Sequence, residues 1–191
     1  MIIRPAIPQD SPGIARIQVD SYLAAYAPIL PAEYLGHFKV AEQEQDWRDW
    51  FAAGSGEILL VASTNDGELA GYALGKQNPG EIPPYETELG ALHVRRENQR
   101  RGLGRQLFSA VSRALLSHGS RSLFLWTLDR NPARTWYEKL GGQLIAEKAW
   151  ENNAEFEVNV FEVGYGWPDL QELIKKTKLI QPEIVERNDE T

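Results

Sequence analysis

Five arginines and two glycines lie close together between Arg95 and Arg105, in a chain whose formal net charge is −7. This segment follows a predicted strand over residues 87–94 and opens a predicted helix, so its glycines fall at a helix N-terminus. At such a position, free backbone N–H groups and the positive end of the helix dipole bind phosphate oxygens. Gly102 and Gly104 let a ligand come close to the main chain. We therefore predict a binding site for a diphosphate.

Two common phosphate-binding motifs do not match this segment. The Walker pattern G-x-x-x-x-G-K-[ST] is absent, and Leu107 stands where the dinucleotide fingerprint needs its third glycine. The pattern that does fit is Gln/Arg-x-x-Gly-x-Gly, which runs from Gln99 to Gly104 after a strand ending in Leu92 to Val94. A tight strand-to-helix turn that binds nothing is the alternative explanation of the same residues.

This hexapeptide resembles the loop with which the GCN5-related N-acetyltransferase (GNAT) family holds the pyrophosphate of acetyl-coenzyme A (acetyl-CoA). Four further segments resemble other parts of the family: "NPARTWYEKLGG" its second cofactor motif, "IRPAIPQD" its first strand and helix entry, "SYLAAYAPILPAEYL" the N-terminal helices of a bacterial subgroup, and "VGYGWPDL" its final strand. The resemblance reaches to about Leu170. It departs at Arg96, where the family usually has proline, and at Gly142, where an aromatic residue is common.

The resemblance implies which residues contact the cofactor. Backbone groups of Leu92, His93 and Val94 would pair with the pantetheine arm, and Asn131 would contact the same arm. The pyrophosphate loop comprises Gln99, Arg100, Arg101, Gly102, Leu103 and Gly104. In a regular strand the side chain of His93 lies on the face opposite Glu88 and Leu92, so we interpret it as structural.

Acetyl transfer to an amine needs a proton acceptor, because an amine of pKa about 10.4 is neutral in only about one molecule in 2500 at pH 7. Family members often have a glutamate six residues before the position of Val94, which makes Glu88 the predicted base and Glu86 its substitute. Glu88 would need burial to raise its pKa, or a water relay. The family's tyrosine at the position of Tyr137 lies near the coenzyme sulfur, so the resemblance assigns Tyr137 the protonation of the departing thiolate. A surface glutamate and a core tyrosine are the alternatives.

The rest of the sequence predicts the elements that position these residues. Strands are expected over 1–6, 57–64, 68–77, 122–128, 143–150 and 155–167, and helices from Asp10, within 31–53, from Leu103 to near Gly119, and from Asn131 as cap with Pro132 first. This order indicates an α/β (α+β) fold. The GNAT resemblance implies a mostly antiparallel sheet of about seven strands, with helices on both faces and a splayed parallel pair. We expect one acetyltransferase domain over 1–170, with a helical extension and frayed tail over 171–191.

Composition excludes several other function classes. The chain has no cysteine and three histidines, which excludes thiol chemistry and makes a metal site unexpected. An excess of acidic residues, 27 against 20 basic ones, opposes nucleic-acid binding. No apolar run approaches the about 20 residues of a membrane span, and the N-terminus lacks a secretory pattern, so we expect a cytoplasmic protein.

Together these observations predict an acetyl-CoA-dependent N-acetyltransferase that uses no metal. Its acceptor is expected to be a primary amine on a small molecule, a polyamine or a peptide, acetylated by direct transfer because no cysteine is present to carry the acetyl group. The alternative is a non-catalytic acyl-CoA-binding or regulatory module. Pairing of two copies through the final strands is common in the family, so the resemblance also allows a homodimer.

Overall fold

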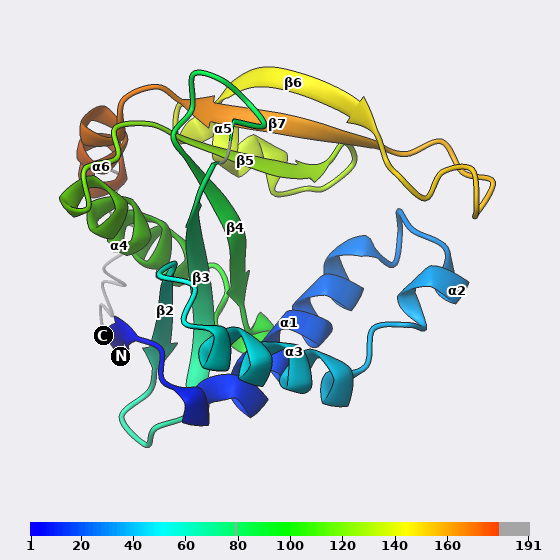
Figure 1. The fold of residues 1–191 in the computed structure, drawn as a ribbon, viewed down its shortest axis with the longest axis horizontal. Coiled ribbons are helices and arrows are strands. Elements are labelled where there is room, and N and C mark those ends of the chain that lie inside the picture. The colour runs from blue at the N-terminus through cyan, green and yellow to red at the C-terminus, as the bar shows by residue number, and fades with distance from the viewer. Residues whose placement is uncertain (79, 180–191) are drawn as a thin grey trace, which may run out of the picture.

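The computed structural model describes residues 1–78 and 80–179, which form a seven-stranded sheet flanked by helices (Figure 1). The strand order is β1-β2-β3-β4-β5-β7-β6, and every neighbouring pair is antiparallel except β4 and β5. The bounds are β1 (Ile2–Pro5), β2 (Ile58–Ser63), β3 (Leu69–Gln77), β4 (Thr87–Val94), β5 (Leu123–Leu128), β6 (Gln143–Ala149) and β7 (Phe161–Trp167). The predicted mixed, mostly antiparallel fold is confirmed.

Helices cover both faces of this sheet, as Figure 1 shows. They are α1 (Ser11–Tyr26), α2 (Ala32–Leu35), α3 (Val40–Ala53), α4 (Leu103–Ser117), α5 (Arg134–Lys139) and α6 (Leu170–Leu179). On one face, Ile14 and Trp47 of α1 and α3 pack on Val61 and Tyr72 of the sheet. On the other face α4 buries Leu107, among other residues, in the main core. Among the described residues, no helix has the length and apolar character needed to cross a bilayer.

The parallel strands β4 and β5 pair only where they begin. Their register contains two pairs, Thr87 with Leu123 and Glu88 with Phe124. Beyond these pairs β4 stays hydrogen-bonded to β3 as far as Val94, while β5 follows β7 along its whole length. The two strands therefore diverge, and the edge of β4 that faces β5 is left without a strand partner.

A bulge at Gly90 changes which side chains of β4 share a face. Ala91 lies opposite Leu74 and Leu89 lies opposite Gly75, so Gly90 is left over. Because one extra residue inverts the alternation, Glu88 and His93 point to the same face, which is the face of α1. The sequence predicted opposite faces for these two side chains on the assumption of a regular strand, and that prediction is wrong.

Two predicted element boundaries also differ from the structure. The helix expected from Asn131 begins at Arg134 with Ala133 as its N-cap, because residues 131–133 form a turn. The last strand begins at Phe161 rather than at residue 155, since residues 151–157 form turns and Phe156 packs against Tyr34. In both cases a side-chain contact replaces the regular backbone pattern.

Helix α6 crosses the domain boundary that the sequence predicted between residues 170 and 171. Leu170 and Leu173 are buried in the main core, and Thr177 Oγ1 donates a hydrogen bond to Ser109 Oγ of α4 at 2.9 Å. We therefore propose that the domain continues through α6. The last part of the helical extension and frayed tail predicted over 171–191, from residue 180 onward, lies outside the described residues.

Candidate active site

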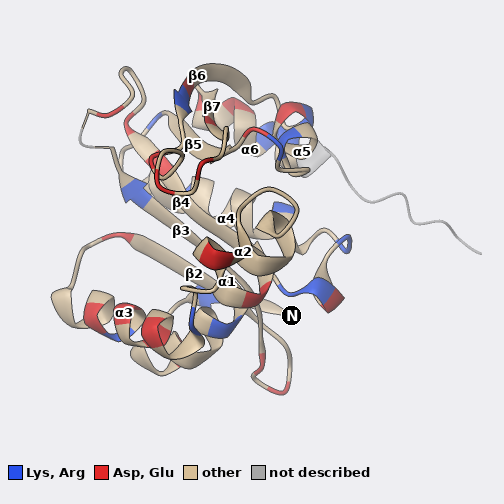
Figure 2. Cartoon of the chain, turned by 90° about the vertical axis from the view of Figure 1, so that its right-hand side faces the viewer, with Lys and Arg blue, Asp and Glu red and all other residues tan. Residues whose placement is uncertain are grey.

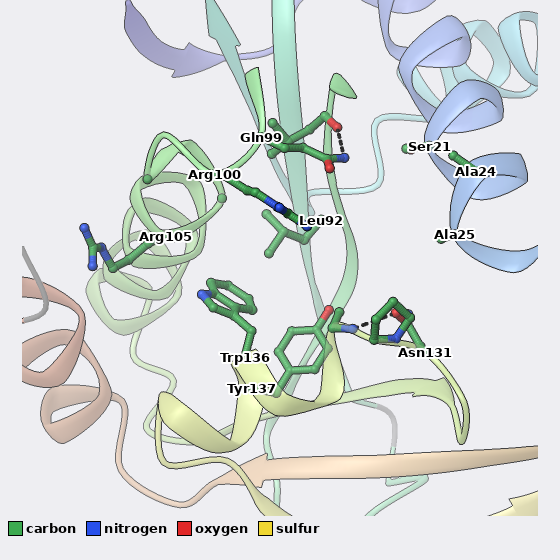
Figure 3. Close-up of a pocket in the computed structure, with 15 residues that line it drawn as sticks. Ser21, Ala24, Ala25, Leu92, Gln99, Arg100, Arg105, Asn131, Trp136 and Tyr137 are labelled. Carbon is green, nitrogen blue, oxygen red and sulfur yellow. Dashed lines mark hydrogen bonds between the residues drawn. The ribbon is translucent and has the colours of Figure 1, made fainter. Parts of the chain in front are cut away.

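The divergence of β4 and β5 opens onto a cleft of about 710 Å³ that continues into a smaller one of about 220 Å³. The larger cleft lies between α1, the loop before α4, and α5, as the close-up in Figure 3 shows. The smaller one runs between the two strands as far as Trp126. Eight residues line both: Ser21, Ala25, Leu92, Val94, Gln99, Asn131, Ala133 and Tyr137. A long, bent ligand can therefore pass from one to the other.

The loop before α4 presents a run of unoccupied main-chain amides. Among the described residues, the N–H groups of residues 100–105 have no hydrogen-bond acceptor, and the first helical bond joins Gln106 N–H to Gly102 O at 3.0 Å. Arg100 at φ 58° and Gly102 at φ 80° turn the loop so that it meets the helix N-terminus. The first turn of any helix leaves its N–H groups without an intrahelical partner, and here the N–H groups of residues 100–102 extend that run. These amides are free and consecutive, which suits an anion.

Gly104 is not required by the packing of the protein itself. A Cβ atom added at Gly104 would meet only Val94 Cγ2, at 3.8 Å, which is an ordinary contact. By contrast, a Cβ at Gly71 would lie 2.7 Å from the carbonyl oxygen of His93. Gly104 lines the larger cleft, so the space left by its missing side chain is open to a ligand. This geometry supports the predicted close approach of a ligand to the backbone.

The open edge of β4 offers main-chain groups to the smaller cleft. The N–H of Arg95 bonds to Ala70 O of β3 at 2.9 Å, and alternate residues direct their polar groups to opposite neighbours. Leu92 and Val94 therefore point theirs toward the cleft, although Val94 O already accepts a bond from Gln99 Nε2 at 2.9 Å. The main chain of His93 points to β3 by the same alternation. The backbone role predicted for His93 does not fit this geometry.

Tyr137 lies at the boundary between the buried core and the cleft. Its ring is 9% exposed and packs in the main core, within 6.3 Å of the ring of Trp167. Figure 3 shows its hydroxyl directed into the cleft, and no described residue forms a hydrogen bond with it. Burial, with a smaller contribution from Tyr26, raises the pKa of Tyr137 well above its ordinary value. The phenol is thus protonated at neutral pH and available as a donor.

Asn131 is held by hydrogen bonds within the protein. Its Nδ2 donates to Thr127 Oγ1 at 2.8 Å and to Tyr26 Oη at 3.2 Å, and its Oδ1 accepts from Ala133 N–H at 2.9 Å. These bonds fix the turn before α5 and the position of Tyr26. The predicted contact with the cofactor arm stays a prediction, and the hydrogen bonds support a positioning role.

Neither predicted base lines the two clefts. Glu88 is 12% exposed and forms an ion pair with Lys76, with Oε2 3.0 Å from Nζ. Glu86 Oε2 accepts a bond from the N–H of Arg121 at 2.6 Å. Glu88 is mostly buried, as a role as base requires, but the ammonium group of Lys76 lies beside its carboxylate. Its role as base stays a prediction and would depend on a relay through water.

His93, unlike the two glutamates, is among the residues that line the smaller cleft. It stacks on Tyr72 with ring centroids 5.2 Å apart, and its Nδ1 lies 2.6 Å from Ser21 Oγ of α1. Burial lowers the pKa of His93 from its ordinary 6.5 to about 4. The side chain is therefore a neutral imidazole at pH 7.

Comparison with known proteins identifies the family. The family model described as FR47-like protein matches residues 68–151, which include β4, the loop with free amides at residues 100–105 (the amide loop) and α5. The chain is 33% identical over 171 residues to the protein named "Uncharacterized N-acetyltransferase YuaI" of Bacillus subtilis (strain 168), and the alignment covers 90% of this chain and 95% of that protein. The chain belongs to the GNAT family.

Solved structures show the same GNAT fold. The PaiA N-acetyltransferase of Thermoplasma acidophilum in complex with coenzyme A is 17% identical, with a TM-score of 0.66 and coverage of 87% of this chain and 98% of that chain. YncA of Salmonella typhimurium, solved with its cofactor acetyl-CoA, is 20% identical, with a TM-score of 0.66 and coverage of 88% and 93%. At these identities the similarity concerns the fold.

The arginines of this GNAT loop divide into two groups. Arg95 is paired with Glu68 and Glu97, whose carboxylates lie 3.4 and 3.8 Å away. Arg100 and Arg105 line the larger cleft and form no ion pair with a described residue. Arg96 and Arg101 also form no ion pair with a described residue but line neither cleft, so two of the four unpaired arginines of this segment lie at the larger cleft. Figure 2 shows that acidic residues predominate on α3, whose one basic residue is Arg48, so this helix carries no basic stripe of the kind that binds nucleic acid.

The GNAT site also includes residues that the sequence did not single out. Ser21, Ala24 and Ala25 of α1 line the larger cleft opposite the loop. Trp136 forms part of the wall of the larger cleft, and Trp126 forms part of the wall of the smaller one. Small residues at positions 24 and 25 leave room between α1 and α5. Their spacing is ordinary for a helix, so only the fold reveals their place.

No group of three or more His, Asp or Glu side chains among the described residues is arranged to hold a metal.

The buried imidazole gives this GNAT protein a testable pH dependence of stability. Because the folded pKa of His93, about 4, lies below its ordinary 6.5, the unfolded chain binds its proton first as the pH falls. The free energy of unfolding should therefore drop by about 2 kcal/mol between pH 7.5 and pH 5 from this group alone. Urea titrations of the wild type and of His93→Gln at both pH values measure it. An equal drop in the two proteins would contradict the assignment.

Proposed function

We propose that this acetyl-CoA-dependent N-acetyltransferase moves the acetyl group directly to a primary amine of a small molecule, a polyamine or a peptide. The observation that carries the proposal is the run of free amides over residues 100–105, at one end of a cleft that also receives the hydroxyl of Tyr137. The free amides suit a diphosphate, and the hydroxyl of Tyr137 suits a departing thiolate. The linking arm would lie in the cleft between them.

The bound coenzyme would be held mainly by backbone groups. The free amides of the loop and the dipole of α4 would bind the pyrophosphate, and Arg100 and Arg105 would add positive charge. The N–H and C=O of Leu92 would pair with the amide groups of the pantetheine arm. Of the predicted loop residues, Gln99 contributes by bonding to Val94 O and thus fixing the start of the loop. Arg101 is exposed and outside both clefts.

The thioester supplies an activated acetyl group, and residues of the chain would handle the charges that develop. A free N–H on the open edge of β4, such as that of Leu92 or Val94, would donate to the carbonyl oxygen as it becomes negative. The hydroxyl of Tyr137 would give its proton to the sulfur as the C–S bond breaks. Direct transfer needs no acetylated side chain, in accordance with the absence of cysteine.

Location and assembly form a further part of the proposal. We place the enzyme in the cytoplasm, and we propose a homodimer formed through the last strands. Strand β6 is the outer edge of the sheet, and its Leu144 is 58% exposed, which supports pairing at that edge. Cell fractionation and sedimentation of the purified protein test these two points.

The function is tested by measuring thiol release from acetyl-CoA with a panel of amines, polyamines, amino acids, aminoglycosides and peptides. We expect release well above the rate without amine for at least one class, and binding of coenzyme A by calorimetry. Binding without release for any amine would favour the non-catalytic module. Absence of binding would show that the amide loop does not serve this coenzyme.

A further inference from the structure

We infer that His93 is a catalytic residue: its Nε2 atom accepts the proton that the acceptor amine loses, and Ser21 holds the imidazole in the tautomer that allows this. The inference rests on the proposed function and deepens it. It assigns the acceptor side of the reaction to a side chain that the sequence alone suggested was structural.

The hydrogen bonds around Ser21 fix the tautomer. Ser21 Oγ lies 2.5 Å from Ile17 O, one turn earlier in α1, and 2.6 Å from His93 Nδ1. A carbonyl oxygen can only accept, so the single hydroxyl hydrogen of Ser21 is donated to Ile17 O. The hydroxyl oxygen must then accept from His93, which places the imidazole hydrogen on Nδ1. Nε2 is left with its lone pair free.

The free Nε2 atom is accessible from the cleft. No described residue donates a hydrogen bond to it. Among the described residues, the hydroxyl of Tyr72 is the one side-chain polar atom that is both fully buried and without a partner. Nε2 is therefore not fully buried, and His93 is among the residues that line the smaller cleft. A ligand atom entering this cleft can reach the lone pair.

The composition of the smaller cleft singles out His93 as its proton acceptor. No Asp, Glu, Lys or Arg is among the described residues that line it. The other titratable groups facing His93 are Tyr26 from α1, Tyr137 from α5 and Tyr72 from β3, and burial raises the pKa of all three. These phenols are protonated and can donate but not accept a proton at neutral pH. The nearest carboxylate on β4, that of Glu88, is outside the cleft and paired with Lys76.

The position of His93 suits a division of roles across the cleft. Tyr137 lies on α5, beyond the diverging β5, whereas His93 projects from β4 on the face of α1. The bulge at Gly90 and the register with Tyr72 set that direction. A thioester lying between the two strands would therefore have a donor at its sulfur side and an acceptor at the side from which the amine enters.

The proton balance of the step is complete. The nitrogen lone pair of a neutral primary amine forms a C–N bond with the acetyl carbon, and the C–S bond breaks with its electron pair on sulfur. The nitrogen becomes positively charged as the new bond forms, which makes its N–H acidic enough for a weak base. His93 Nε2 takes that proton, and Tyr137 Oη gives one to the thiolate. Solvent returns the proton from His93 to Tyr137, so the products are an amide and a thiol.

The experiment uses three variants and the most active amine of the panel. His93→Gln keeps similar size and polarity but cannot take up a proton, and we expect kcat to fall about 100-fold, at the low end for general base catalysis because the base is weak. Coenzyme A affinity by calorimetry should stay within about twofold. Ser21→Ala removes the hydrogen bond that fixes the tautomer of His93, and we expect a smaller fall in kcat, about fivefold. For His93→Ala, added imidazole should restore activity in proportion to its concentration, which a packing residue would not show.

Each outcome decides between the two proposals. If the wild type binds coenzyme A and acetylates the amine while His93→Gln is as active, the inference about His93 is wrong and the proposed function stands. Loss of coenzyme binding in His93→Gln together with no imidazole rescue in His93→Ala would make His93 a structural residue, which also overturns the inference. If the wild type releases no thiol with any amine, the proposed function fails and the inference falls with it.

Discussion

Replacing Gly104 with leucine is expected to weaken coenzyme A binding by about 1000-fold without destabilising the fold. The added side chain meets only Val94 in the protein and otherwise projects into the larger cleft, where it blocks approach to the free amides. A hydrogen bond to a charged group contributes about 1.5–3 kcal/mol. The loss of two such bonds corresponds to about 4 kcal/mol, or roughly a factor of 1000. Calorimetric titration with coenzyme A measures the change.

The stability measurement separates this effect from misfolding. Gly104 is in the first turn of α4 with ordinary helical backbone, so leucine should raise the free energy of unfolding by about 0.5–1 kcal/mol. Gln106→Leu is the matched control, because it places the same side chain on the same turn at an exposed position outside both clefts. A folded Gly104→Leu protein with wild-type affinity would refute the assignment of the loop.

The predictable parts of the fold are those with short-range signals. Asp66 and Gly67 mark the turn between β2 and β3, and the unbroken apolar run of β5 indicates a strand covered on both faces, which is what the structure shows. The glycine-containing turn between β4 and α4 was predictable for the same reason, because glycines at a strand-to-helix junction act through the local backbone. These features need no knowledge of distant residues.

The parts that were missed depend on contacts between distant segments. The bulge falls at Gly90, and a glycine inside a strand is a signal for a bulge, but the pairing of β4 with β3 is what shows the shift in register. Gly142 departs from the aromatic residue usual in the family because a Cβ there would lie 2.7 Å from the ring of Trp167. The space is filled by an aromatic ring from β7 instead. The periodicity of a single segment does not show when a side chain from another strand fills the space beside it.

The candidate site shows the same division. Gln99, Arg100, Gly102 and Gly104 of the predicted loop line one cleft together with Tyr137, whereas Arg101 is exposed outside it and Leu103 is buried in the main core. Ser21 lies 72 residues before His93 in the sequence, and only the packing of α1 on β4 brings them together. The sequence thus pointed to the residues proposed to bind the cofactor, whereas the pair proposed on the acceptor side, Ser21 and His93, is brought together only by the fold.

Tyr137→Phe is expected to lower kcat about 1000-fold while leaving coenzyme A affinity within about twofold. The phenol of Tyr137 has no partner among the described residues and stays protonated, so its one expected function is to donate to the departing sulfur. General acid catalysis of this kind contributes about 10²–10⁴-fold. Phenylalanine fills the same volume in the core, so packing around Trp167 is kept. Steady-state kinetics of thiol release and calorimetry measure the two quantities.

Tyr165→Phe is the matched control for this prediction. Tyr165 is 1% exposed in the same core, with its ring centroid 6.0 Å from that of Tyr137. Its hydroxyl, however, donates a hydrogen bond to Glu138 Oε1 and accepts one from Arg134 Nε. Tyr165 lines neither cleft. Its removal should cost stability, about 1–3 kcal/mol because a buried network loses a member, and leave kcat near wild type. Parallel losses of kcat and affinity in Tyr137→Phe would instead indicate a residue that shapes the binding site, since a proton donor acts only as the C–S bond breaks.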